Sequence, residues 1–135
     1  MIRWNIRWDE KLTSYAYAED LDFSYNYYKK SVEDDYICVL SDKVRVEHRV
    51  STEYRTPSKK TTMMYIINRE YLSYKHGMGI ESRLLIRWCN IGDLIIRALR
   101  NDKPWDLLLA QMICDKHRKD IRRGIIKPEW YESIS

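Results

Sequence analysis

The chain has 135 residues, of which 44% are hydrophobic and 13% aromatic. This length fits one domain (residues 1–135) with a buried core, and the composition excludes a disordered chain. The net charge of +4 is uneven: residues 1–42 hold five basic and nine acidic residues (−4), and residues 43–135 hold nineteen and eleven (+8). Such a dipole can steer a basic face to nucleic acid or dock copies head to tail, although the two halves can also face each other within one fold.

The remaining composition indicates a reducing compartment and an aromatic-rich surface. Three cysteines, Cys38, Cys89 and Cys114, are far apart and odd in number, so we expect free thiols and a cytoplasmic protein. The start lacks the apolar run of a signal peptide, and no stretch has the length of a membrane span. Eleven Tyr and five Trp against a single Phe favour sheet surfaces and interfaces.

Apolar residues recur at every second position in much of the first half of the chain. Residues 2–8 alternate as in a half-buried strand, and the period of two continues through residues 15–27. Since Tyr, Ser and Asn are weak helix formers, we favour a hairpin there over a helix at residues 11–19. Residues 36–40, 44–55 and 61–67 then predict strands of an antiparallel meander.

From Ile80 the apolar spacing becomes helical. A stripe predicts a helix over about 80–100, and Gly92 inside it suggests a close contact. The stripe consists of Ile80, Leu84, Trp88, Ile91, Ile95 and Ala98, widened by Leu85, Leu94 and Leu99. A second helix over about 103–123 has Asp102 as its expected N-cap, Pro104 in its first turn and Gly124 as its stop. Its expected inward residues are Trp105, Leu108, Leu109, Met112 and Ile113, and Trp130 in the tail is expected to dock.

These elements predict an α+β fold. An antiparallel sheet of about five or six strands covers residues 2–74, and the two helices pack on one face of it.

The join between the two halves is a glycine loop, Lys75-His76-Gly77-Met78-Gly79. Backbone amides at Gly77 and Gly79, the dipole of the following helix and the charges of Lys75 and His76 would favour an anion there. The segment from Gly77 to Leu85 resembles the acetyl-coenzyme A loop of GCN5-related N-acetyltransferases. This resemblance implies a degenerate acyl-CoA binder. The chain departs from the family at His76, at Glu81 and in having a helical end without the family's later strands.

Two basic groups are candidates for contact with nucleic acid or a protein partner. One lies on an expected strand face and its turn, and comprises Arg45, Arg49, Arg55, Lys59 and Lys60. The other lies at the end of the second helix, and comprises Lys116, Arg118, Lys119, Arg122 and Arg123. Cations in such clusters can neutralise phosphates, although a solvated helix end or an ordinary ion-paired strand face has the same pattern.

No motif supplies a catalytic residue, a cofactor site or a metal site, since Cys114-x-x-His117 alone offers zinc too few ligands. We therefore expect a small non-enzymatic interaction or assembly protein that binds a protein partner or itself, without membrane contact. A nucleic-acid-binding domain and the acyl-CoA binder are the alternatives.

Overall fold

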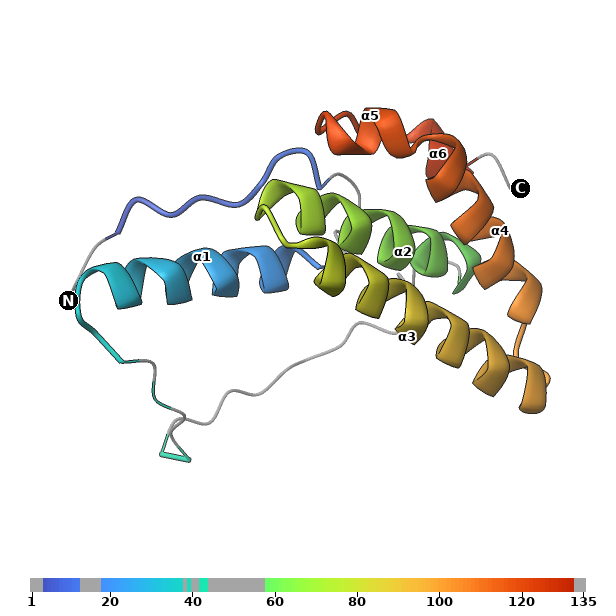
Figure 1. Cartoon of the computed structure of the whole chain (residues 1–135), viewed down its shortest axis with the longest axis horizontal. Coiled ribbons are helices and arrows are strands. Elements are labelled where there is room, and N and C mark those ends of the chain that lie inside the picture. Colours follow the sequence, from blue (N-terminus) through green and yellow to red (C-terminus); the bar gives the residue numbers. More distant parts are fainter. Residues whose placement is uncertain (1–3, 13–17, 38, 40–41, 44–57, 133–135) are drawn as a thin grey trace.

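The computed structural model describes residues 4–12, 18–37, 39, 42–43 and 58–132, and these residues form helices but no strand (Figure 1). The predicted α+β fold with an antiparallel sheet over residues 2–74 is therefore wrong. Residues 4–9 have no regular secondary structure, and the expected strand at 44–55 lies outside the described residues. In chain order the helices are α1 (Glu19–Glu33), α2 (Ser58–Lys75), α3 (Ile80–Leu99), α4 (Pro104–Lys116), α5 (Arg118–Arg122) and α6 (Glu129–Glu132).

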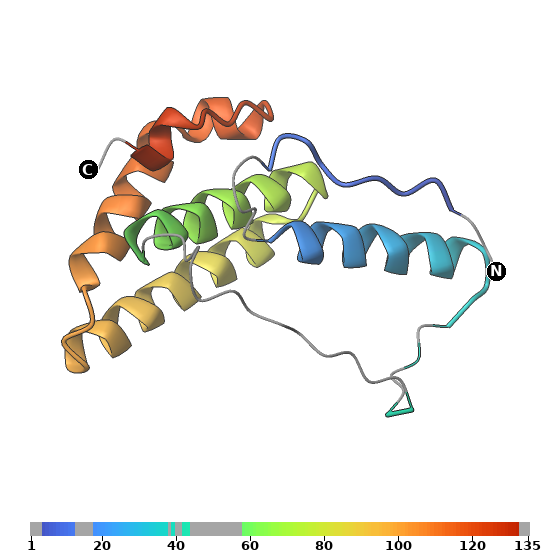
Figure 2. The same cartoon turned by 180° about the vertical axis from the view of Figure 1, so that it is seen from behind.

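Helix α2 is the central element of the fold, and α3, α4, α5 and α6 all pack against it (Figures 1 and 2). Ile66 and Asn68 are both buried although, two positions apart, they lie on nearly opposite sides of the helix. A helix that is buried all round has no apolar stripe with a period of 3.6. This explains why its first half, residues 61–67, resembles a strand in sequence.

Helix α1 replaces the expected hairpin of residues 15–27. Its first turn contains Glu19, Asp20 and Asp22, whose negative charges favour the helix N-terminus. Near its end, Lys30 Nζ lies 3.0 Å from Asp34 Oδ1, an i,i+4 pair that supports the last turn. The acidic first turn and this charge pair thus offset the weak helix propensity of Tyr, Ser and Asn here.

The helix predicted over about 80–100 is confirmed, and the range of about 103–123 is helical but holds two helices instead of one. Helix α3 fits the expected range, while the second helix divides at His117 into α4 and α5. Lys103, in the left-handed conformation with φ of 46°, takes the N-cap position expected for Asp102, and Pro104 opens the first turn as predicted. Gly124 stops α5 with a positive φ of 75°, also as predicted. Gly92 marks no close contact, since a Cβ there would meet nothing within 4 Å.

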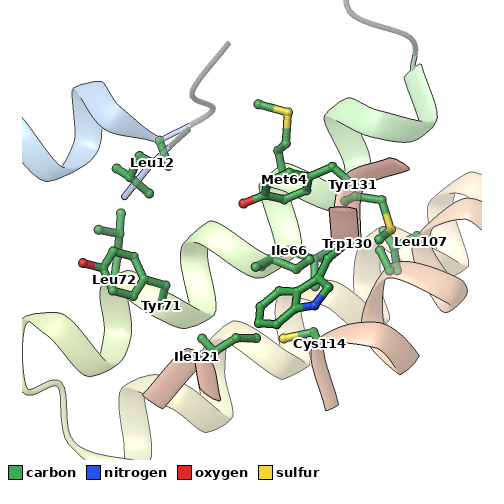
Figure 3. Packing of buried hydrophobic residues seen from close by; sticks show 14 residues of the cluster. Leu12, Met64, Ile66, Tyr71, Leu72, Leu107, Cys114, Ile121, Trp130 and Tyr131 are labelled. Carbon is green, nitrogen blue, oxygen red and sulfur yellow. The ribbon is translucent and has the colours of Figure 1, made fainter. Parts of the chain in front are cut away.

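The hydrophobic core gathers side chains from the N-terminal segment, α2, α4, α5 and α6 (Figure 3). The predicted docking of Trp130 is confirmed: its ring is buried and stacks on His117 with centroids 4.4 Å apart. The next residue, Tyr131, donates a hydrogen bond of 2.9 Å from its hydroxyl to Asn68 Oδ1. No residue of α1 or α3 belongs to the described core cluster itself, although Leu94 of α3 packs against it.

Candidate interaction surface

Helix α3 turns its apolar side to solvent. Trp88 is 72% exposed and Leu99 is 84% exposed. The large apolar side chains exposed along this helix are Ile80, Leu84, Leu85, Trp88, Ile91, Ile95, Ile96 and Leu99. The apolar stripe predicted from the sequence exists, but nothing among the described residues covers it.

The opposite, polar side of α3 faces the helices of the same chain. Arg87 Nη2 lies 2.7 Å from Asp115 Oδ1 of α4 and 3.8 Å from Glu70 Oε1 of α2. Arg97 donates to Thr62 Oγ1 at 3.2 Å, again reaching α2. For Arg87 and Asp115, burial opposes ionisation, but the hydrogen bond between the two side chains outweighs burial. The pKa of Asp115 is therefore lowered and the pKa of Arg87 is raised. Helix α3 is therefore attached by ion pairs and hydrogen bonds on its polar side.

Helix α4 extends the exposed apolar surface. Leu107, Ala110 and Cys114 are buried, whereas Trp105, at 75% exposure, Leu108 and Met112 are exposed. The prediction that Trp105, Leu108 and Met112 face inward is therefore wrong. The i, i+3, i+7 spacing of these three residues gives them a common side of the helix.

A groove of about 170 Å³ joins the two helices, with Ile91 of α3 and Leu108 of α4 among its lining residues. Asn90 and Gln111 also line it, and Asn90 Nδ2 donates to Gln111 Oε1 at 3.0 Å. The Oδ1 atom of Asn90 is buried without a hydrogen-bond partner in the described part of the chain. The apolar surface therefore continues from α3 to α4, with one unsatisfied acceptor in the groove between them.

The area of this surface is large for a protein of this size. A fully exposed large side chain presents about 150–250 Å², so the exposed apolar side chains of α3 and α4 together present on the order of 1,000 Å². The largest apolar patch on a typical monomer is about 300–600 Å². A standard protein interface buries about 800 Å² on each partner. The exposed face of α3 and α4, called here the α3–α4 face, has the area of an interface.

A second groove, of about 360 Å³, lies on the other side of α3, where α1, α2 and α3 meet. Leu21 and Tyr25 of α1 and Leu85 of α3 line it, together with Leu72, His76 and Met78 from α2 and the following loop. Its walls are mainly apolar. It therefore extends the apolar surface from α3 towards α1.

A buried carboxylate holds α1 to the end of α2. Asp22 is 1% exposed. Its Oδ2 lies 2.8 Å from Lys75 Nζ and its Oδ1 lies 2.8 Å from His76 Nε2. Tyr25 contacts the His76 ring edge to face, with centroids 4.4 Å apart. A buried charge needs partners of this kind, so this cluster fixes where α1 begins on the bundle.

Asp9 extends the cluster to the N-terminal segment. Its Oδ2 accepts hydrogen bonds of 2.6 Å from both Lys75 Nζ and the Tyr71 hydroxyl. Burial would raise the pKa of Asp9, but these two bonds outweigh it and hold that pKa below its usual value. Burial and the same carboxylate raise the pKa of Tyr71. Asp9 and Asp22 thus share Lys75, and this ion-pair network joins the N-terminal segment, α1 and the end of α2.

The cationic side chains of the glycine loop already have carboxylate partners, which an anion site would need to leave free. Lys75 and His76 are paired with Asp22, and Lys75 also with Asp9. Gly77 adopts a positive φ of 62°, but a Cβ at Gly77 or Gly79 would meet nothing within 4 Å. The loop connects α2 to α3, so the strand that precedes the acetyltransferase loop is replaced by a helix. Anion binding at Lys75, His76, Gly77 and Gly79 stays a prediction.

The structure separates the candidate basic residues. Lys59 and Lys60 lie in the first turn of α2, whereas Lys116, Arg118, Lys119, Arg122 and Arg123 lie at the end of α4 and in α5. Helix α5 lies beside the second half of α2, close to Tyr71, so the two groups are at different ends of that helix (Figures 1 and 2). Arg118 is also paired with Asp115. Arg45, Arg49 and Arg55 lie outside the described residues.

Two parts of this arrangement were missed from the sequence. The Asp22 cluster joins residues more than fifty positions apart, and neither Asp22 nor Asp9 stands in a recognisable motif. The exposed side of α1 does have a signal: Leu21, Tyr25, Tyr28 and Val32 follow a 4-3-4 helical spacing. The period of two in the same residues obscures it.

The described cysteines are free thiols and lie in no metal-binding group. Among the described cysteines, Cys89 is exposed and free, and Cys114 is free and buried, with burial raising the pKa of the Cys114 thiol to about 12. The described ranges contain no group of three or more His, Cys, Asp or Glu side chains that could hold a metal. None of the described helices is long and apolar enough to cross a membrane.

Comparisons with models of protein families, with curated proteins and with solved structures give no match. The function is therefore argued from the geometry of the chain itself.

Proposed function

We propose that this chain is a small, non-enzymatic assembly protein whose contact surface is the α3–α4 face. The observation that supports this most directly is the orientation of α3. Its apolar side, with Leu84, Trp88 and Ile95, faces solvent, while its polar side makes the ion pairs and hydrogen bonds that attach it to α2 and α4. An amphipathic helix in a free-standing domain has the reverse orientation.

The energetics favour a covered face. Removing on the order of 1,000 Å² of apolar surface from water gives roughly 25 kcal/mol before the costs of association are subtracted. Those costs are about 4–15 kcal/mol or more, so a complementary partner leaves a net gain. Trp88 and Trp105 are suited to be energetic centres, because Trp is enriched among residues that dominate interfaces.

The unsatisfied Asn90 Oδ1 supports the same proposal. A buried acceptor without a partner costs about 1–3 kcal/mol. Asn90 lines the groove between α3 and α4, so a small shift of its buried amide on docking would present Oδ1 to a partner's donor. Such a polar position also sets the register of a helix that docks on the face.

The test is photo-crosslinking of the full chain in the cells that produce it. A benzophenone side chain replaces Trp88 on the face, and in a matched control it replaces Lys119, an exposed residue of α5 away from the face. We expect a defined adduct from position 88 that is absent from position 119. Introducing Ile91→Glu into the position-88 chain should abolish it, because a charge in the face opposes desolvation.

An identical adduct pattern from positions 88 and 119 would overturn the proposal. So would a position-88 adduct that persists with Ile91→Glu, since its formation would then not depend on the apolar face. Circular dichroism of the Ile91→Glu chain, with unchanged helix content, separates loss of contact from loss of fold.

A further inference from the structure

Helix α1 has a second uncovered apolar stripe. Leu21, Tyr25, Tyr28 and Val32 are all exposed and lie on one side of the helix. Another part of α1 packs against the N-terminal segment, where Trp8 stacks on Phe23 with centroids 4.5 Å apart and Trp4 meets Tyr27 at 4.8 Å. The segment and the helix thus form an arm that is stabilised by its own aromatic contacts and leaves the stripe uncovered.

The α1 stripe meets the edge of the exposed apolar side of α3 at Leu85, the residue next to Leu84. Leu21, Tyr25 and Leu85 line the 360 Å³ groove, so the two apolar surfaces meet there. From this groove α1 and α3 run in roughly opposite directions (Figures 1 and 2). Within one chain, therefore, the arm cannot lie along α3, although both surfaces are apolar.

We propose that the occupant of the α3–α4 face is a second copy of this chain, whose α1 stripe lies along α3. The inference rests on the proposed function and names the partner. A two-fold axis passing near the groove places α1 of each copy in the direction of α3 of the other. The arm of each copy then lies on α3 of its partner. Such an interface is isologous and closes on itself as a dimer.

The two stripes match in spacing and direction. Leu21, Tyr25, Tyr28 and Val32 follow a 4-3-4 pattern, and Leu84, Trp88, Ile91 and Ile95 follow the same pattern. Both helices start at the groove, so α1 of one copy runs parallel to α3 of the other. Matched heptad spacing is the pattern by which parallel helices interdigitate their side chains.

The charges at the far end of this contact are complementary. At 1.5 Å per residue, α1 spans about 22 Å and α3 about 30 Å. The exposed acidic end of α1, Glu33, Asp34 and Asp35, thus reaches the part of α3 that precedes the exposed Arg100 and Lys103. Lys30 pairs with Glu33 and Asp34 but leaves this end with a net negative charge. The same complementarity holds overall, since residues 1–42 carry −4 and the remainder carries +8.

The experiment measures the mass of the full-length chain by sedimentation equilibrium at concentrations up to about 100 µM. The wild-type chain should be a dimer. Tyr28→Glu in the arm and Ile91→Glu in α3 should each weaken it by at least about a hundredfold, because each places a charge in both copies of the contact. Lys119→Glu, on α5, is the control and should leave the dimer intact.

Mixing the two variants distinguishes the arm contact from a direct α3–α3 contact. One Tyr28→Glu chain and one Ile91→Glu chain together have one contact without any substitution, so the mixture should regain dimers that neither variant forms alone. If α3 pairs with α3 directly, Tyr28→Glu alone stays dimeric and the mixture regains nothing. Either of those results overturns the inference.

A monomeric wild-type chain also overturns it. If that monomer still gives the Ile91-dependent adduct at position 88, the proposed function stands and the occupant is a different protein. If the adduct is absent as well, both proposals fail. Unchanged helix content of Tyr28→Glu, whose side chain is exposed, ensures that the loss of dimer reports the contact.

Discussion

Helices α2 and α3 are neighbours of similar length with opposite relations between sequence and surroundings. Helix α2 has apolar and polar residues mixed around its axis and is buried on nearly every side. Helix α3 has sharply separated apolar and polar sides, and the apolar side is the exposed one. Amphipathicity thus indicates which side of a helix needs an apolar partner, but not whether that partner belongs to the same chain.

The polar residues of the two helices differ in the same way. On α2 they are buried and have hydrogen-bond partners: Ser73 Oγ donates to the Glu70 carbonyl of the same helix at 2.6 Å, and Asn68 accepts from Tyr131 of α6. On α3 they form the attachment to the bundle through Arg87 and Arg97. Polar groups therefore complete the core around α2, and beneath α3 they act beside the one apolar contact that Leu94 makes with the core.

The largest expected effect is a difference between Ile67→Ala on α2 and Ile95→Ala on α3. Ile67 is fully buried, so its truncation should cost about 2–5 kcal/mol of unfolding free energy. Ile95 is exposed, so in dilute solution its truncation should cost no more than about 0.5 kcal/mol. Urea unfolding at low protein concentration measures both values.

The same pair should respond differently to protein concentration. If a partner copy covers α3, Ile95→Ala loses stability relative to the wild type as concentration rises, whereas the deficit of Ile67→Ala stays constant. A large, concentration-independent cost at Ile95 would contradict the assignment of α3 as a docking helix.

A smaller effect is expected from Asp22→Asn, which removes the buried charge between α1 and α2. Lys75 keeps Asp9 as a partner, but His76 loses a carboxylate, so we expect a cost of about 1–3 kcal/mol. Hydrogen exchange should show faster opening of the first turns of α1 than in the wild type. Glu19→Gln, exposed in the same turn, is the matched control and should change the unfolding free energy by less than about 0.5 kcal/mol.

Acid should weaken both networks to a still smaller extent. The folded-state pKa values of Asp9 and Asp115 lie below the usual 3.8. The stability from each group is therefore present above pH 3.8, and it is lost as the pH falls below 3.8 through the folded pKa. Denaturant midpoints from pH 6 to pH 2 measure this loss, and Asp9→Asn and Asp115→Asn should each make the profile shallower. If the denaturant midpoints of both variants fell with acid as steeply as those of the wild type, the lowered pKa values of Asp9 and Asp115 would be contradicted.

The sequence supports prediction of helices only where one side is consistently apolar. Helix α4, with apolar side chains on both its buried and its exposed sides, was located from Pro104 in its first turn instead. The condition holds for α3, whose range is confirmed. It fails for α2, because burial on all sides removes the period, and for α1, where Leu21, Phe23, Tyr25 and Tyr27 also fit a period of two. Both failures led to the wrong sheet.

The site shows the same limit. Exposure of Trp88 and Trp105 depends on which side of α3 and α4 faces α2. On α3, Leu94 and the ion pairs of Arg87 with Glu70 and Asp115 lie on the side that faces the bundle. Those partners lie on other helices, so no local pattern reveals them. The apolar stripe was predictable from spacing, while its exposure required the tertiary contacts.

The smallest expected effect is that of Gly92→Ala on the unfolding free energy, and it differs between an uncovered and a covered α3. Gly92 lies within α3, where a Cβ would meet nothing within 4 Å, so Gly92→Ala should stabilise the isolated chain by about 1 kcal/mol through helix propensity alone. Its neighbours one turn away, Trp88 and Ile96, belong to the exposed apolar side, so a docked helix from another copy approaches this position closely. The gain should therefore appear in urea unfolding at low protein concentration and shrink or reverse where the dimer forms. A gain that is constant over the whole concentration range would mean that nothing packs against the middle of α3.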